Sequence, residues 1–270
     1  MSLQSESVFS KIIKQAKYAR RFIKNDGIFE FIYFMRNKPR FYEAFEPVID
    51  RHDFPTESFR DLEVPKDLKV TKWTHYFDIY DQYLKKFRKQ ENLKVLEIGV
   101  AGGGSLKMWR DYFGPDATIY GIDIDEACST ITNTGCEIRI GSQVDRDFLH
   151  SVLAEMGGID VVIDDGSHLN SHVVETFSVL FPLLNSGGTY LIEDMSTSYW
   201  PGVYKGGLRR RGTSIEFFKN LTDLPNRFFF SRKLKKQFRF ESVESVHFHP
   251  SVIVVLKWTA AKMKIWRNYN

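Results

Sequence analysis

The sequence predicts an α/β fold, a doubly wound, Rossmann-like and mostly parallel sheet with an antiparallel C-terminal hairpin. From residue 72 onward, short apolar runs alternate with amphipathic helical segments, which is typical of βαβ units with right-handed crossovers. The first of these runs ends in a glycine-rich turn at residues 99–104. Near the C-terminal end, two apolar runs at 238–249 and 252–258 are joined by Pro-Ser, which predicts a hairpin at one sheet edge.

Each element follows from its own periodicity. The segment 75–87 has helical spacing of apolar and aromatic residues and precedes the sheet. Parallel strands are expected at 94–100, 118–125, 137–142, 159–165 and 187–194. Helices are expected at 103–114, 145–156, 171–184 and 214–221. Val161, Val162 and Ile163 form an unbroken apolar run, which indicates a strand buried on both faces.

The domain boundary is expected near residue 68, with a small helical and loop-rich N-terminal extension (1–68) before the main domain (69–270). Apolar residues over 7–24 recur at helical spacing between Lys and Arg, which predicts a basic amphipathic helix. We expect this helix to pack on its own domain or on a second subunit, which favours a homo-oligomer. The alternative is peripheral contact with an anionic membrane.

Composition excludes several classes of protein. No stretch of the 270 residues approaches the roughly 20 apolar residues of a membrane span, and the N-terminus lacks the apolar core of a secretory signal. The only cysteines, Cys128 and Cys136, give no disulfide framework and no zinc spacing. Residues 1–40 hold nine Lys/Arg and three Asp/Glu, so the rest of this +4 chain is nearly neutral. We therefore expect a cytoplasmic protein with no nucleic-acid partner.

The glycine-rich turn predicts a nucleoside site. Gly99 and Gly103 lie between a strand and a helix that starts near Ser105, and glycine permits a ligand to approach the backbone closely. Asp123 ends the next strand, where a carboxylate can accept hydrogen bonds from ribose hydroxyls. Glu97, two residues before Gly99, would repel a pyrophosphate but suits a cationic ligand such as S-adenosylmethionine. A plain βα turn without a ligand is the alternative.

Acidic residues follow two strands that we expect to be neighbours. Asp164 and Asp165, with His168 three residues later, end one strand, and Glu193 and Asp194 end the next. Because strand ends meet at one edge of a parallel sheet, these carboxylates should converge and would repel one another unless a cation lies between them. Mg²⁺ prefers such oxygen ligands, and Mn²⁺ or Ca²⁺ could replace it. Asp165 would then hold the metal, with His168 placed as a base for a hydroxyl. Helix capping by Asp165 and His168 is the alternative.

Together these residues resemble class I S-adenosylmethionine-dependent O-methyltransferases, and more narrowly the metal-dependent sugar O-methyltransferases of macrolide tailoring. Some members of that broad family carry the label "cephalosporin hydroxylase". The similar stretches lie within roughly residues 71–205 and include "KVLEIGVAGGGSLKMWRDYF", "GIDID", "IGSQVDRDFL", "IDVVIDDGSHLNSHVVETFSVLFPLL" and "GGTYLIEDMSTSYWPG".

The resemblance assigns roles to individual residues. It implies that Mg²⁺ is held by Asp165, Glu193 and Asp194, and that the catalytic pair is His168, as general base, with Asp165. The cofactor contacts it implies are Glu97, Gly99, Gly103, Ser105, Asp123, the segment around Gln143, and the helix that contains Tyr76, while Asp164 supports the cofactor or the residues behind it. Ala101 departs from the family pattern, where glycine is frequent.

The expected reaction is methyl transfer from S-adenosylmethionine to a hydroxyl of a sugar or glycoconjugate. Vicinal hydroxyls of a sugar fit capture by a metal, and so does a catechol, so a catechol-like small-molecule acceptor remains an alternative. The loop after the last parallel strand holds Tyr199, Trp200 and Tyr204, which could stack on a sugar ring, and residues 209–211, three arginines that could meet an anionic group or be solvated. Two further functions stay open at this point, a nucleotide-dependent oxidoreductase or hydroxylase on the same sheet and a non-enzymatic binding module.

Overall fold

The structure is a computed structural model, and it describes residues 57–59 and 65–259. The predicted basic helix at 7–24 and most of the predicted extension lie outside these residues, so the predicted domain boundary remains a prediction. Phe59, which belongs to the predicted extension, is fully buried against Phe77 and stacks on Tyr112 at a ring-centroid distance of 4.5 Å. Part of the segment before residue 68 therefore packs in the core of the main domain.

A seven-stranded sheet forms the centre of the molecule, in the order β3-β2-β1-β4-β5-β7-β6. Its strands are β1 (Lys94–Ile98), β2 (Thr118–Asp123), β3 (Glu137–Ile140), β4 (Val161–Asp164), β5 (Thr189–Ile192), β6 (Val243–His249) and β7 (Val252–Lys257). The first five strands pair in parallel, and β7 pairs antiparallel with both β5 and β6. The predicted mostly parallel sheet with a C-terminal hairpin is therefore confirmed.

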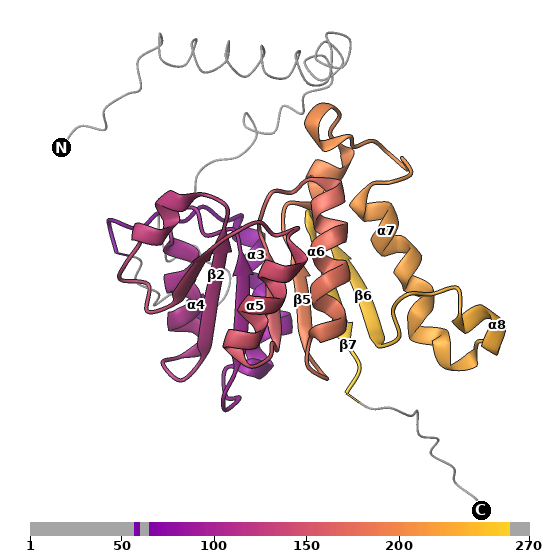
Figure 1. Cartoon of the computed structure of the whole chain (residues 1–270), viewed down its shortest axis with the longest axis horizontal. Coiled ribbons are helices and arrows are strands. Elements are labelled where there is room, and N and C mark those ends of the chain that lie inside the picture. The colour runs from indigo at the N-terminus through magenta and orange to yellow at the C-terminus, as the bar shows by residue number, and fades with distance from the viewer. Residues whose placement is uncertain (1–56, 60–64, 260–270) are drawn as a thin grey trace, which may run out of the picture.

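Helices cover both faces of this sheet (Figure 1). The α-helices are α3 (Thr74–Leu84), α4 (Gly104–Phe113), α5 (Arg146–Met156), α6 (Asn170–Leu183), α7 (Ser214–Asn220) and the short α8 (Arg232–Lys235). Short 3₁₀ turns are η3 (Glu57–Phe59), η4 (Lys85–Phe87), η5 (Glu126–Thr130), η6 (Met195–Tyr199), η7 (Gly202–Tyr204) and η8 (Leu221–Phe229). The sequence patterns did not predict η8 and α8, because a 3₁₀ segment interrupted by Pro225 has no clear helical period.

Strand alternation divides the core into two layers. In β1, Leu96 and Ile98 pack with α5 and α6, whereas Val95 packs with α3 and α4. In β4, Val162 faces the α5–α6 layer, and Val161 faces the α3–α4 layer. Because successive side chains of a strand point to opposite faces, the same alternation decides where the polar residues at each strand end are directed.

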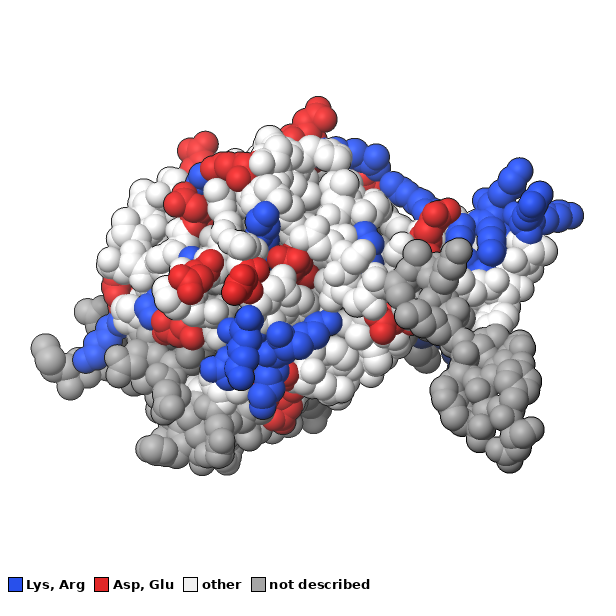
Figure 2. Space-filling view, turned by 90° about the horizontal axis from the view of Figure 1, so that it is seen from below, with Lys and Arg blue, Asp and Glu red and all other residues white. Residues whose placement is uncertain are grey.

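Lys and Arg are unevenly spread over the surface. The view from below shows blue side chains gathered at the right-hand end, where α8 lies beyond the β6 edge of the sheet (Figure 2). No helix of the described ranges 57–59 and 65–259 is long and apolar enough to cross a lipid bilayer.

Candidate active site

The glycine turn after β1 packs directly on the turn after β4. Gly99 has a φ of 93°, and its amide donates to the carbonyl of Ile122 at 2.9 Å. A Cβ on Gly99 would lie 2.2 Å from the carbonyl oxygen of Asp165. Only glycine permits this approach, because any side chain would collide with backbone. The predicted cofactor loop and the predicted metal loop are therefore in contact.

Asp123 closes the glycine turn from the end of β2. Its Oδ2 accepts hydrogen bonds from the amides of Val100 and Ala101 at 2.8 and 3.0 Å, and its Oδ1 accepts from the Asp125 amide at 2.9 Å. Burial acts to raise the pKa of Asp123, but these amide hydrogen bonds outweigh it and hold the pKa below its ordinary value. An ionised carboxylate thus stands beside the turn.

An open cavity of about 670 Å³ lies against this carboxylate. Its walls come from the segment before α3, from the glycine turn, and from the end of β2 with the turns that follow it. The lining residues are Asp67, Leu68, Lys69, Ala101, Gly102, Asp123, Asp125, Ala127, Cys128, Thr130, Ile131 and Thr132. The cavity is large enough for a nucleoside and has its acid at the position that the sequence predicted.

Three other predicted cofactor contacts have structural partners. Glu97 is fully buried and accepts hydrogen bonds from Ser105 Oγ and Trp109 Nε1, each at 2.9 Å. Burial raises the pKa of Glu97 to about 7, against the lowering effect of Lys72. Gly103, with a φ of 75°, precedes the first residue of α4. Glu97 and Ser105 thus tie β1 to α4 beneath the turn, and their predicted contact with the cofactor remains a prediction.

The two aspartates at the end of β4, Asp164 and Asp165, point to opposite faces of the sheet. Asp164, the last residue of β4, is 1% exposed and accepts a hydrogen bond from Tyr190 Oη at 3.2 Å. Burial raises its pKa to about 7. Gln143 lies on the same side, and its Oε1 accepts from the Ser167 amide at 2.8 Å. Asp164 and Gln143 therefore support the turn from behind.

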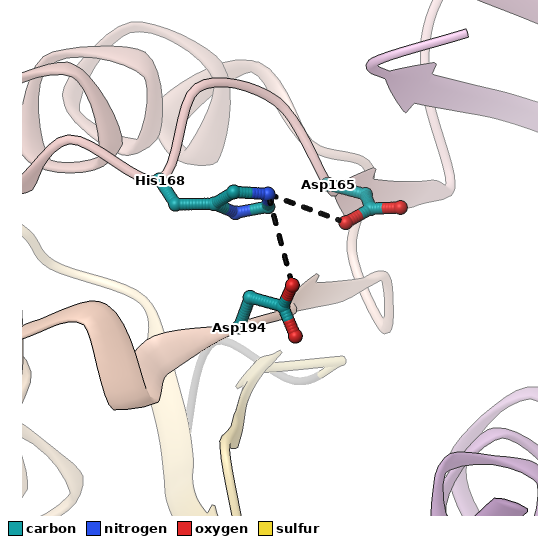
Figure 3. A group of neighbouring side chains, drawn as sticks. All are labelled: Asp165, His168 and Asp194. Carbon is teal, nitrogen blue, oxygen red and sulfur yellow. Dashed lines mark ion pairs between the residues drawn. The ribbon is translucent and has the colours of Figure 1, made fainter. Parts of the chain in front are cut away.

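Asp165, His168 and Asp194 come together in front of that turn (Figure 3). His168 Nε2 lies 3.7 Å from Asp165 Oδ1 and 3.9 Å from Asp194 Oδ2. His168 and Asp194 both have positive φ, 55° and 53°, which is uncommon for residues other than glycine and is found at functional sites. Thr197 Oγ1 donates to the His168 carbonyl at 3.1 Å and holds this strained backbone in place.

Lys72 lies at the back of the cluster, and the sequence patterns did not identify it. Its ammonium group is 2.6 Å from Asp165 Oδ2 and 2.7 Å from Glu193 Oε2, and the Lys72 side chain is only 3% exposed. Burial alone would lower the pKa of Lys72, but Glu193 and Asp165 outweigh it and raise the pKa above its ordinary value. Lys72 is therefore a buried cation bound to two of the predicted metal ligands. No signal in the sequence marks it, because a lysine before a helix is ordinarily solvated.

Glu193 has both carboxylate oxygens occupied. Oε2 binds Lys72, and Oε1 accepts a hydrogen bond from Tyr80 Oη at 2.7 Å. Tyr76 donates to Asp194 Oδ1 at 2.7 Å, and its predicted contact with the cofactor remains a prediction. Helix α3 thus supplies two tyrosines that orient the acids after β5, a role that the sequence did not predict for either.

The Asp165–His168–Asp194 cluster meets the requirements of a divalent-cation site. Each of the three residues offers one ligand atom, and these three atoms lie within 4.8 Å of one another. Asp165 and Asp194, whose side chains are 24% and 37% exposed, supply the hard oxygen ligands that Mg²⁺ or Mn²⁺ takes. Glu193 lies outside this group, and its two oxygens accept hydrogen bonds from Lys72 and Tyr80. Its ligand role remains a prediction.

The loop after β5 is fastened to the start of α6. The side chain of Asn170 donates to the carbonyl of Tyr204 at 2.6 Å and accepts from the Ser214 amide at 2.7 Å and from Ser198 Oγ at 2.9 Å. Trp200 and Tyr204 contact each other edge to face with ring centroids 5.6 Å apart. Residues 209–211, the three arginines, are exposed. The aromatic loop is therefore anchored at Asn170, close in the chain to the histidine of the cluster.

Comparison with known proteins finds a methyltransferase domain and relatives that are named as sugar O-methyltransferases. The profile of a family described as a methyltransferase domain matches residues 96–195. The chain is 41% identical over 194 residues to 8-demethyl-8-alpha-L-rhamnosyl tetracenomycin-C 2'-O-methyltransferase of Streptomyces olivaceus, covering 67% of this chain and 50% of that protein. It is 43% identical over 155 residues to mycinamicin VI 2''-O-methyltransferase of Micromonospora griseorubida, covering 53% of this chain and 38% of that protein.

A solved structure shares the fold. The MycE methyltransferase from the mycinamycin biosynthetic pathway, in complex with Mg, SAH and mycinamycin VI, superposes with a TM-score of 0.61 at 34% identity, covering 72% of this chain and 50% of that chain. The chain spans about half the length, or less, of the curated relatives it matches. The chain therefore carries a methyltransferase domain over residues 96–195, and through the domain that holds this site it is similar to class I S-adenosylmethionine-dependent O-methyltransferases that are named for sugar substrates.

Proposed function

We propose that this chain transfers a methyl group from S-adenosylmethionine to a hydroxyl group of a sugar or glycoconjugate, with the help of a divalent cation. The observation that carries the proposal is the contact between two sites, since the Gly99 turn beside the cavity packs on the backbone of Asp165. A donor in the cavity and an acceptor at the acid–histidine cluster would thus be neighbours. Similarity to named sugar O-methyltransferases, and to a structure in complex with Mg and SAH, supports the proposal.

The cofactor would lie over the glycine turn in the cavity. The Asp123 carboxylate is ionised and stands where ribose hydroxyls could donate to it, in addition to the amides it already accepts. The next residue, Ile124, has a 74% exposed side chain, which offers an apolar surface for a purine ring. The backbone of Gly102 lines the same cavity and leaves room for the remainder of the ligand.

His168 is the base in this proposal. As the acceptor oxygen attacks the sulfonium methyl group, a carbon–oxygen bond forms, the carbon–sulfur bond breaks, and the hydroxyl proton passes to His168 Nε2. The sulfonium leaves as a neutral thioether, so no other reactant is needed. Asp165 and Asp194 flank Nε2 at 3.7 and 3.9 Å and would stabilise the imidazolium that results.

Asp165 and Asp194 are also the residues that would hold Mg²⁺, with Mn²⁺ or Ca²⁺ as substitutes. When bound there, the cation would polarise an acceptor hydroxyl and ease its deprotonation. Thr197 and Tyr76 hold the backbone of His168 and the carboxylate of Asp194, so the two loops keep their geometry. Glu193 would either bind the cation or keep only its contact with Lys72. A Glu193→Gln variant distinguishes these two roles, because its Mn²⁺ affinity should fall in the first case and stay at the wild-type value in the second.

The test is production of S-adenosylhomocysteine by the purified chain with Mg²⁺ and a panel of glycosides that carry vicinal hydroxyls. The His168→Gln and Asp165→Asn variants are compared with His150→Gln and Asp147→Asn, whose wild-type side chains are exposed on α5. We expect His168→Gln to lower turnover by about a hundred- to ten-thousandfold. Both control variants should retain wild-type turnover.

Mn²⁺ binding measured by electron paramagnetic resonance separates the roles of the cluster residues. If His168 is the base, His168→Gln loses turnover but binds Mn²⁺ as the wild type does, whereas Asp165→Asn loses both. Loss of Mn²⁺ binding in His168→Gln would instead make the imidazole a ligand. Full turnover in both variants on an acceptor that the wild type methylates would contradict the proposal.

A further inference from the structure

The segment formed by η8, α8 and the turn that follows them is strongly basic between its flanking acids. Between Asp223 and Glu241 the chain holds six basic and no acidic side chains, namely Arg227, Arg232, Lys233, Lys235, Lys236 and Arg239. Arg232, Lys233, Lys236 and Arg239 are exposed, and Arg227 pairs with Glu241 at 2.8 Å. The segment lies at the end of the molecule where Figure 2 shows Lys and Arg gathered beyond the β6 edge.

The same segment exposes large apolar side chains. Phe229 is 76% exposed, Leu234 is 44% exposed and Phe228 is 39% exposed. Exposed apolar groups gathered beside one another on a protein surface commonly mark an interaction site. We name the surface made by these three residues with Arg232, Lys233, Lys236 and Arg239 the basic aromatic surface.

The basic aromatic surface is held by the fold. Ser231 Oγ accepts a hydrogen bond from the Leu234 amide at 3.3 Å and begins α8. Phe230 packs on Phe238 with ring centroids 5.4 Å apart, and Phe228 contacts Trp258 edge to face at 5.8 Å. The exposed side chains are therefore displayed from an anchored backbone.

We propose that the basic aromatic surface docks this protein on an anionic lipid membrane. Aromatic and aliphatic side chains surrounded by Lys and Arg are the combination that inserts at a bilayer interface while its cations meet anionic headgroups. Charge complementarity favours this occupant over a second copy, because two such surfaces facing each other would bring their cations together. It also disfavours the chain's own residues 260–270, which hold three basic and no acidic side chains.

Docking by this surface would leave the candidate active site open. The surface lies beside β6, whereas the cavity lies at the ends of β1 and β2, on the other side of β4, β5 and β7 in the sheet order. Binding of S-adenosylhomocysteine and binding of vesicles should therefore be independent. The inference does not rest on the proposed methyl transfer and would stand if that proposal failed.

The test is sedimentation of the full chain with vesicles of phosphatidylcholine alone or mixed with phosphatidylglycerol. We expect binding to the mixed vesicles only, weakened by added salt. A basic side chain near an anionic surface strengthens binding roughly fivefold, so Lys233→Gln with Lys236→Gln should weaken it roughly 25-fold. The matched control, Lys85→Gln with Lys89→Gln, removes two exposed lysines after α3 and should bind as the wild type does.

A second pair of substitutions tests the apolar contribution. Phe229→Ser with Leu234→Ser should also weaken vesicle binding, while thermal stability and S-adenosylhomocysteine affinity stay at wild-type values. Absence of binding to mixed vesicles would overturn the proposal. So would unchanged binding in the Lys233/Lys236 variant, which would place the contact elsewhere in the chain. Self-association of the wild type that Phe229→Ser and Leu234→Ser abolish, without vesicle binding, would instead identify a contact between copies.

Discussion

The buried ammonium of Lys72 should be one of the largest single contributions to the stability of the domain. Lys72→Met keeps the length and apolar stem of the side chain and removes only its charge. Asp165 Oδ2 and Glu193 Oε2 would then lose partners at 2.6 and 2.7 Å, and Glu193 has no route to water because it is 1% exposed. Breaking a buried ion pair from one side costs about 3–5 kcal/mol.

The assay is urea unfolding of both proteins in EDTA and again with Mn²⁺. We expect the free energy of unfolding to fall by about 3–5 kcal/mol for Lys72→Met in EDTA, a large part of the roughly 5–15 kcal/mol of a typical domain. The control is Lys219→Met, which removes an exposed pair with Glu216 (2.6 Å, side chains 44% and 26% exposed) and should cost less than about 1 kcal/mol.

Divalent cations should partly restore the Lys72→Met variant. Without the ammonium, Asp165 and Glu193 repel each other, so a bound cation would relieve more strain in the variant than in the wild type. The increase in unfolding free energy on adding Mn²⁺ should therefore be larger for the variant. A Lys72→Met variant that stays within about 1 kcal/mol of the wild type in EDTA would refute the assignment of Lys72 as the cation that compensates these acids.

Three further predictions concern the cofactor side of the site. Burial raises the pKa of Glu97 to about 7, so the folded chain binds the proton of the Glu97 carboxyl more tightly than the unfolded chain does. The unfolding free energy should therefore fall by about 3 kcal/mol as the pH rises from about 4.5 to 7. Glu97→Gln should reduce this slope in urea unfolding at several pH values, while the contribution of Asp164, whose pKa is also raised to about 7, should remain. An identical slope in the variant would contradict the reasoning. Gly99→Ala should cost more than about 3 kcal/mol, because its Cβ would collide with backbone. Gly114→Ala, at φ 91° and ψ 174° but with open space around its Cβ position, should cost about 1–3 kcal/mol, and equal thermal shifts for the two would argue against the close approach. Asp123→Ala should weaken binding of S-adenosylhomocysteine at least roughly tenfold by calorimetry, because the substitution leaves the amides of the glycine turn without their acceptor and removes the carboxylate beside the cavity. The control is Asp116→Ala, which replaces an exposed aspartate.

The fold was predictable because its signals are local. Apolar periodicity and glycine turns identify β1, β2, β4 and β5 with their intervening helices, and the Pro-Ser turn marks the hairpin of β6 and β7. The segment η8–α8 was missed because 3₁₀ geometry and Pro225 leave no regular period. Strand ends at one sheet edge also bring Asp165 and His168 near Asp194, as expected.

The partners of those acids could not be predicted. Lys72 is 93 residues from Asp165 and 121 residues from Glu193 in the chain, and Tyr80 is 113 residues from Glu193. No periodicity or spacing rule connects positions so far apart. Such contacts depend on how the segment before α3 crosses the ends of the strands, which follows from packing of the whole α3–α4 layer.

By itself, the sequence determined that apolar strands end in acids and a histidine, and that a glycine turn and Asp123 stand beside them. Only the tertiary structure decided what each acid does. Alternation in β4 directs Asp164 toward Tyr190 and Asp165 toward Lys72. From α3, Tyr80 donates a hydrogen bond to Glu193 and Tyr76 donates one to Asp194 Oδ1. The physical reason is that a buried carboxylate must find a donor or a cation, and the donor within reach is set by the packed fold.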